Sequence, residues 1–156
     1  DLVFVSIFLA VVFGLFFVAI LKAKIFGITL IEYVKPIWYF VLVAVATVFW
    51  QYLIGVTLEG TSLQLRISQW LWEAMVLASA YKLSRIPKFS YANMFFLGIL
   101  YSLLIHGLKV SIRYFFYAKT LWYALDRFLY GGLLVMAIAF VMGSVFVYLK
   151  KKNSRY

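Results

Sequence analysis

Residues Leu129–Lys152 read LYGGLLVMAIAFVMGSVFVYLKKK, an apolar run that ends in three lysines. No charged residue lies between Leu129 and Leu149, and an α-helix needs only about 20 apolar residues to cross a hydrocarbon layer about 30 Å thick. Lysines directly after such a run are typical of the end of a membrane span. The pattern therefore predicts a spanning helix with a basic end, which we place at Leu121–Leu149.

The composition indicates that the rest of the chain also lies in a membrane. Hydrophobic residues make up 67% of the 156 residues and charged residues only 13%, whereas soluble domains are roughly half apolar and a quarter charged. Cysteine is absent and histidine occurs once, which excludes disulfides, cysteine metal sites and bis-histidine haem ligation within this sequence. We expect no cofactor and no nucleic-acid partner, because the net charge of +10 follows the ends of the apolar runs.

Five apolar runs predict an all-α transmembrane bundle that forms a single domain over residues 1–156. In lipid every backbone N–H and C=O must be bonded within the protein, and the runs lack the two-residue alternation of barrel strands. The expected spans are Leu2–Leu21, Pro36–Val56, Arg66–Leu83, Tyr91–Leu108 and Leu121–Leu149. Leu2–Leu21 lacks a basic leader and a small-residue cleavage site, so we interpret it as a span rather than a signal peptide. The start at Asp1 suggests processing or a missing native start.

The basic residues predict which side of the membrane each terminus faces. With five spans, ten of the fifteen basic residues fall on the side of the C-terminus, together with one acid, Glu32. The other side holds five basic and four acidic residues. Because lysine and arginine concentrate in cytoplasmic loops, we expect a plasma (inner) membrane protein with its N-terminus outside and its C-terminus in the cytoplasm.

Two connections between the expected spans contain apolar or aromatic residues between cations. Lys22–Lys35 includes the apolar stretch Ile25–Leu30, and Lys109–Thr120 reads KVSIRYFFYAKT. Each is expected either to lie flat in the membrane interface, with its charges toward headgroups, or to extend an adjacent span.

Polar residues within the expected spans form one candidate site in the outer half of the bilayer. Arg66, Gln69 and Glu73 share a helical face by their spacing. A carboxylate inside a span is costly unless it is paired, protonated or facing water, so Glu73 is a functional-site hypothesis. Its alternative role is a bond to a neighbouring helix that stabilises the bundle. The full candidate cluster is Arg66, Gln69, Glu73, His106, Lys109, Arg113, Asp126 and Arg127.

The remaining members of this cluster come from the fourth and fifth expected spans. His106, Lys109 and Arg113 lie on one face, which becomes more cationic toward the outside. His106 is either a proton relay, a partner of Glu73 or an ordinary interface residue. Asp126 and Arg127 are adjacent and point to different faces, so each must interact with another helix, headgroups or water. The cluster either neutralises itself or holds a lipid headgroup or small anion.

Small residues four apart predict close packing between helices, either inside the bundle or between copies. The pairs are Ala74 with Ala78, Gly98 with Ser102, and Ala139 with Gly143.

Three short motifs follow the order of a known membrane family. They are WLWEAMVL at Trp70–Leu77, RIPKF at Arg85–Phe89 and ALDRFLY at Ala124–Tyr130. With them, the layout from Pro36 onward resembles the phosphate-starvation-inducible PsiE family, and this resemblance implies a small non-enzymatic inner-membrane protein. The sequence departs from the family by a span before Pro36, a longer connection after the fourth span and a histidine at 106 near an expected arginine.

The sequence contains none of the common catalytic motifs: HExxH, GxSxG, a P-loop or a Rossmann glycine pattern. We therefore expect a non-catalytic integral membrane protein that acts as a subunit or accessory factor of a membrane assembly. Its partners would be the lipid bilayer and either another protein or further copies. The alternative is a transporter or substrate-binding component that uses the cluster around Glu73, and a third hypothesis is a lipid-modifying enzyme that uses Glu73, His106 and Asp126.

Overall fold

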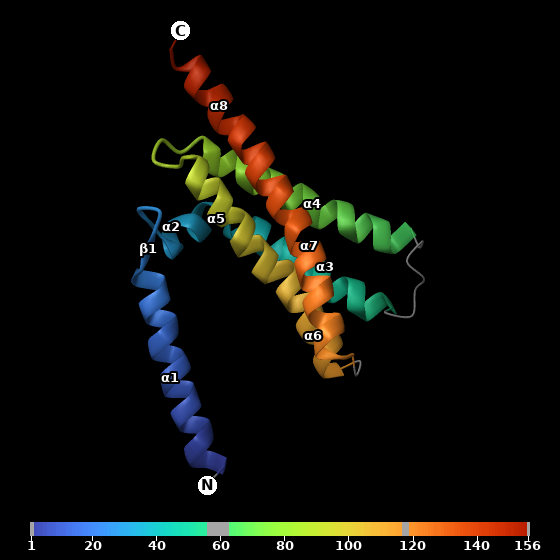
Figure 1. The fold of residues 1–156 in the computed structure, drawn as a ribbon. Helices are drawn as coiled ribbons and strands as arrows, with labels where there is room; N and C mark the ends of the chain where they lie inside the picture. Colours follow the sequence, from blue (N-terminus) through green and yellow to red (C-terminus); the bar gives the residue numbers. More distant parts are fainter. Residues whose placement is uncertain (1, 56–62, 117–118, 156) are drawn as a thin grey trace.

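The computed structural model describes residues 2–55, 63–116 and 119–155, and nearly all of these residues are helical. Figure 1 shows a bundle of long helices with the N-terminal helix pointing away from it. The helices are α1 Leu2–Lys22, α2 Leu30–Val34, α3 Trp38–Gly55, α4 Leu63–Ser84, α5 Tyr91–Tyr101, α6 Leu108–Phe116, α7 Leu121–Ala137 and α8 Gly143–Asn153. The all-α helical bundle expected from the sequence is confirmed.

Helices occur at all five positions predicted from the apolar runs, but they differ in apolar length. Three segments are long and apolar enough to cross a membrane: Leu30–Tyr52, Tyr91–Phe115 and Leu121–Asn153. The apolar run Ser6–Lys22 of α1 is shorter, and α4 is not apolar enough to join the three. These segments support a membrane protein, and the count of five spans stays a prediction.

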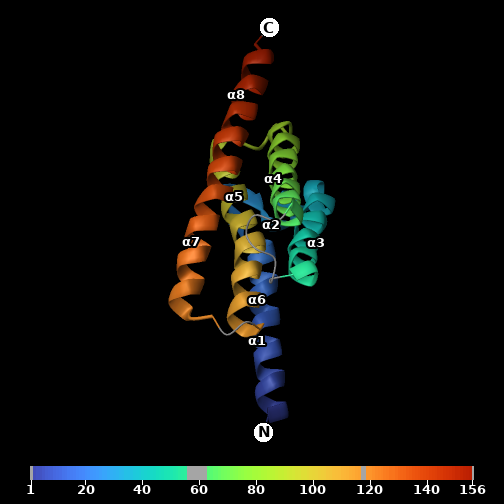
Figure 2. The same cartoon turned by 90° about the vertical axis from the view of Figure 1, so that its right-hand side faces the viewer.

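The two most C-terminal long helices each contain a π-helical turn. The turn Ser102–Gly107 (η2) joins α5 to α6, and the turn Ile138–Met142 (η3) joins α7 to α8. Each set forms one continuous helix in Figure 2. The segment Lys109–Thr120 was expected either to lie flat in the interface or to extend an adjacent span. Its residues up to Phe116 extend the preceding helix. Such π turns shift the side chains that follow them around the helix axis.

Small residues allow two long helices to pack closely: the one formed by α5, η2 and α6, and the one formed by α7, η3 and α8. A Cβ added at Gly98 would lie 3.0 Å from the Cα of Met136, and Ser102 Oγ donates a hydrogen bond to Gly132 O at 3.0 Å. Gly143 receives the side chain of Met94. Of the three small-residue pairs predicted to support packing, the two that contain Gly98 and Gly143 lie inside this chain's own bundle.

A short β-hairpin precedes the first long apolar segment. Its strands, β1 Lys24–Ile25 and β2 Ile28–Thr29, pair antiparallel across a two-residue turn. Both turn residues have positive φ, 52° at Phe26 and 81° at Gly27, as a type I′ turn requires. The segment Lys22–Lys35 thus combines a hairpin with residues that extend the next span, and the hairpin was not expected.

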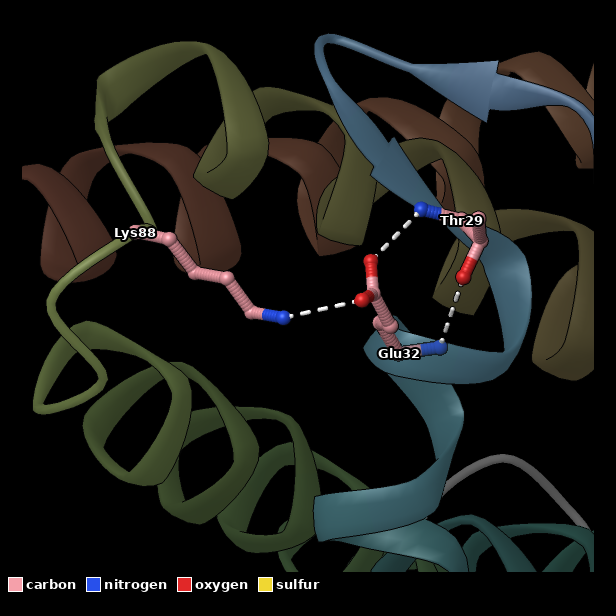
Figure 3. Close-up of polar contacts among 3 residues, drawn as sticks. All are labelled: Thr29, Glu32 and Lys88. Carbon is pink, nitrogen blue, oxygen red and sulfur yellow. Dashed lines mark hydrogen bonds and ion pairs between the residues drawn. The ribbon is translucent and has the colours of Figure 1, made fainter.

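The hairpin is connected to the bundle by capping and by one ion pair, which Figure 3 shows. Thr29 caps α2: its N–H donates to Glu32 Oε2 at 3.0 Å, and Glu32 N–H donates to Thr29 Oγ1 at 3.4 Å. The other carboxylate oxygen of Glu32 pairs with Lys88 Nζ at 3.0 Å. This ion pair joins the start of α2 to the turn between α4 and α5, at the end of the bundle where α8 also ends.

Candidate functional site

The indole ring of Trp72 lies at the centre of a group of cationic and aromatic side chains. Trp72 is buried on α4. The imidazole of His106 approaches the indole edge-on, with ring centroids 5.4 Å apart at 88°, and Lys109 Nζ lies 5.2 Å from the indole centroid. Because η2 carries His106 and α6 carries Lys109, the group joins α4 to the long helix Tyr91–Phe116.

Two further aromatic side chains extend this group across α3 and α7. Tyr52 on α3 donates a hydrogen bond to Lys109 O at 3.2 Å, and its ring lies 5.9 Å below the guanidinium of Arg113. Arg113 also donates to Tyr123 Oη at 3.1 Å. We define the cation–aromatic cluster as Tyr52, Trp72, His106, Lys109, Arg113 and Tyr123.

His106 is held between two helices by its ring. It packs against the ring of Trp72, and it lies so close to Gly131 of α7 that a Cβ at that position would overlap the ring. The sequence carries a signal for this contact, since Gly131 and Gly132 form a glycine pair within an apolar helix. His106 is therefore a packing residue between α4 and α7 as well as a polar one.

Lys109 is the most unusual member because it is a largely buried lysine whose ammonium has no hydrogen-bond acceptor among the described residues. Its exposed fraction is 7%, and the contact of its ammonium is with the face of Trp72. The charges of Arg113 and Glu73 both act on Lys109, but Glu73 and Lys109 form no direct ion pair within the described ranges. A buried cation that is only partly compensated is costly in a membrane and marks a functional site by default.

Unpaired polar atoms gather at the same place. Among the described residues, four buried side-chain polar atoms lack a hydrogen-bond partner, and two of these are Trp72 Nε1 and His106 Nε2. The other two, Gln51 Oε1 and Ser144 Oγ, belong to residues outside the cluster. Buried polar atoms are normally bonded to protein or water, so these unpaired atoms mark the cluster as a place where hydrogen-bonding partners are missing.

The structure brings together part of the predicted cluster and leaves the rest apart. His106, Lys109 and Arg113 lie within the cation–aromatic cluster, and Glu73 is half-buried at its border. Arg127 is exposed and reaches the cluster only through the ring of Tyr123, 5.6 Å from its guanidinium. The remaining members are exposed on the surfaces of α4 and α7. They are Arg66, Gln69 and Asp126.

The candidate cluster predicted from the sequence did not include the aromatic members, Tyr52, Trp72 and Tyr123. Their contacts with cations come from different helices and leave no spacing pattern in the sequence. The cluster contains two cations, Lys109 and Arg113, and unpaired polar atoms, and only one half-buried acid, Glu73, lies at its border. Such a site suits a ligand group that is anionic or forms hydrogen bonds. Comparisons with known protein families, with curated proteins and with solved structures find no match for this chain.

Proposed function

We propose that this protein is a non-catalytic integral membrane protein that acts as a subunit or accessory factor of a membrane assembly. The observation that carries the proposal is the position of α1. Its main packing within the chain is with α2, and every residue from Ala10 to Ala19 is exposed. Figure 1 shows the helix extending away from the bundle. The resemblance to the PsiE-like family stays a prediction and points the same way.

An apolar helix whose middle, Ala10–Ala19, is exposed among the described residues is available to helices of another chain. Helices in a bilayer associate by close packing rather than by the hydrophobic effect. Gly14, near the middle of α1, has no neighbouring atom within 4 Å of the place where a Cβ would lie. The partner expected there is a membrane helix of another protein or of a second copy.

A single-cysteine crosslinking experiment tests this role, because the chain has no cysteine of its own. Gly14→Cys in native membranes is expected to form crosslinks to another polypeptide when a short bis-maleimide is added. Ala139→Cys is the matched control, because Ala139 is fully buried in the bundle. Mass spectrometry of the product identifies a second copy or a different protein. The proposal would be wrong if cysteines placed at successive positions from Ala10 to Ala19 all gave no crosslink and left the protein as a monomer.

We further propose five spans, with the N-terminus outside and the C-terminus in the cytoplasm of a plasma (inner) membrane. The grouping of cations supports this orientation: Lys82, Lys88 and Lys150 make their contacts at the end of the bundle where α8 ends. Maleimide labelling of Gln64→Cys and Lys88→Cys in intact cells tests it. Five spans place these residues on opposite sides of the membrane, with the first accessible from outside. Labelling of both from one side would mean that α4 does not cross.

The second candidate function is a substrate-binding or transport component that uses the cation–aromatic cluster. The specific observation is the largely buried residue Lys109, whose ammonium lies over Trp72. In the same cluster, Trp72 Nε1 and His106 Nε2 have no hydrogen-bond partner among the described residues. A poorly compensated charge such as that of Lys109 lowers stability, so ligand binding explains its presence better than a role in folding does.

Replacing Lys109 with methionine is expected to leave the free energy of unfolding unchanged or to raise it by about 1 kcal/mol. The reason is that an apolar side chain of similar length replaces a poorly compensated charge on a buried residue. Stabilisation by added inorganic phosphate or acetate, measured as a shift in melting temperature in detergent, is expected to disappear. Lys35→Met is the control, since Lys35 is exposed at the other end of the bundle. A large loss of stability in Lys109→Met would show that Lys109 is structural.

A further inference from the structure

A cavity lies at the basic end of the bundle, where α8 ends, and it shares no lining residue with the cation–aromatic cluster. It has a volume of about 590 Å³ and is lined by Tyr91, Tyr148, Lys151, Lys152 and Arg155. The first residue begins α5. Tyr148, Lys151 and Lys152 lie along the end of α8, which packs beside α5, and Arg155 follows that helix. The lining therefore consists of three cations and two phenol groups, with no acid.

The side chains of the three cations in this cavity form no hydrogen bond or ion pair among the described residues. Lys151 Nζ lies 4.6 Å from the ring centroid of Tyr91. The side chains of Lys152 and Arg155 have no hydrogen bond or ion pair within the described parts of the chain. The neighbouring Lys150 differs, because its ammonium donates to Ser84 O and Ile86 O, both at 2.9 Å. Lys150 is thus hydrogen-bonded to the backbone of another segment, whereas Lys151 contacts a ring and Lys152 and Arg155 form no such bond among the described residues.

The single acid expected on this side of the membrane does not neutralise the cavity. Glu32 is paired with Lys88 at 3.0 Å. An anion entering the cavity therefore meets three cations with no competing carboxylate in the lining. Phosphate oxygens accept several charge-assisted hydrogen bonds at once, which suits lysine, arginine and tyrosine hydroxyl donors together.

The cavity lies at the shared end of two apolar segments that are long enough to cross a membrane. Tyr91 begins one apolar segment, and Lys151 and Lys152 lie at the end of another. One turn deeper, Phe95 contacts the ring of Phe140 with centroids 5.7 Å apart, and their exposed fractions are 39% and 41%. A molecule with a phosphate in the cavity can therefore lay an acyl chain along these two exposed rings.

We propose that this cavity binds the phosphate group of an anionic phospholipid. The cationic lining holds the phosphate, and the exposed face formed by Phe95 and Phe140 accommodates an acyl chain. Basic pockets between membrane helices are known to recognise anionic headgroups. The apolar surface below the cavity favours a lipid over a free phosphate ion. This inference is independent of the proposed role as a subunit.

The test uses the full-length protein in a neutral detergent and three probes: phosphatidylglycerol, phosphatidylcholine and inorganic phosphate. Lipid adducts are counted by native mass spectrometry, and stabilisation is measured as a shift in melting temperature. The triple variant Lys151→Gln, Lys152→Gln and Arg155→Gln removes the cations of the cavity. The matched control removes three cations elsewhere by Lys22→Gln, Lys24→Gln and Lys35→Gln. A third variant, Tyr91→Phe with Tyr148→Phe, keeps both rings and removes only the hydroxyls.

Phosphatidylglycerol is expected to bind and stabilise the wild-type protein more strongly than phosphatidylcholine. Its affinity is expected to fall at least about tenfold in the cavity variant and to persist in the control. The double phenylalanine variant should show a smaller loss. An equal loss in the control would overturn the proposal, because attraction would then come from overall charge. Equal binding of phosphatidylcholine, or full stabilisation by inorganic phosphate alone, would also overturn it.

Discussion

Replacing Asn93 with alanine is expected to lower the free energy of unfolding by about 3 kcal/mol, because it leaves several buried polar groups without partners. Asn93 is 1% exposed at the start of α5. Its Oδ1 accepts a hydrogen bond from Ser90 N at 2.7 Å, which caps the helix. Its Nδ2 donates to Tyr33 Oη at 2.6 Å and to Phe26 O at 3.3 Å. One side chain therefore joins a helix cap, a buried phenol and the β-hairpin.

The exposed ion pair of Figure 3 provides the comparison for this prediction. Glu32→Gln removes the charge partner of Lys88, and the two side chains are 43% and 53% exposed, so water screens the pair and the expected loss is small. Tyr33→Phe removes one hydroxyl and leaves the cap of α5 intact, and should lie between the two. Chemical unfolding in mixed micelles measures all three. If Asn93→Ala cost no more than Glu32→Gln, the buried network would not be what holds the hairpin to α5.

The positions of the long helices could be predicted from the sequence because a membrane fixes their length and requires internal backbone bonds. The hairpin could not be predicted. Its strands contain two residues each, too few for an alternating pattern, and Phe26 occupies a positive φ that non-glycine residues seldom adopt. Its position depends on the bond between Tyr33 and Asn93, which are 60 residues apart.

The candidate site was predictable only along single helices. His106, Lys109 and Arg113 share a face by their spacing, and they do lie in one cluster. On α4 the same reasoning chose Arg66 and Gln69, which are exposed, because the buried face of that helix passes through Ser68, Trp72 and Val76 instead. Glu73 follows Trp72 and is half-buried at the edge of that face. Spacing shows which residues share a face, but packing decides which face is buried.

Replacing Gly131 with alanine is expected to lower the free energy of unfolding by about 2 kcal/mol, although alanine is the better helix former by about 1 kcal/mol. The added Cβ would overlap the imidazole of His106, a rigid ring that also packs against Trp72. Because a packed ring cannot yield as a flexible side chain does, we expect either α7 or the π turn that carries His106 to shift. The change should therefore also alter the environment of the Trp72 indole, which near-ultraviolet circular dichroism can detect.

Two further glycines provide matched controls for Gly131→Ala. A Cβ at Gly132 would lie 3.7 Å from Ser102 Cβ, an ordinary contact, and a Cβ at Gly14 would meet no atom within 4 Å. Both alanine variants should be neutral or stabilising by up to about 1 kcal/mol, the gain in helix propensity. Adding His106→Ala to Gly131→Ala removes the overlapping ring, so the double variant should be more stable than the two separate losses predict. If the losses simply added, or if Gly131→Ala and Gly132→Ala behaved alike, His106 would not be confined between α4 and α7.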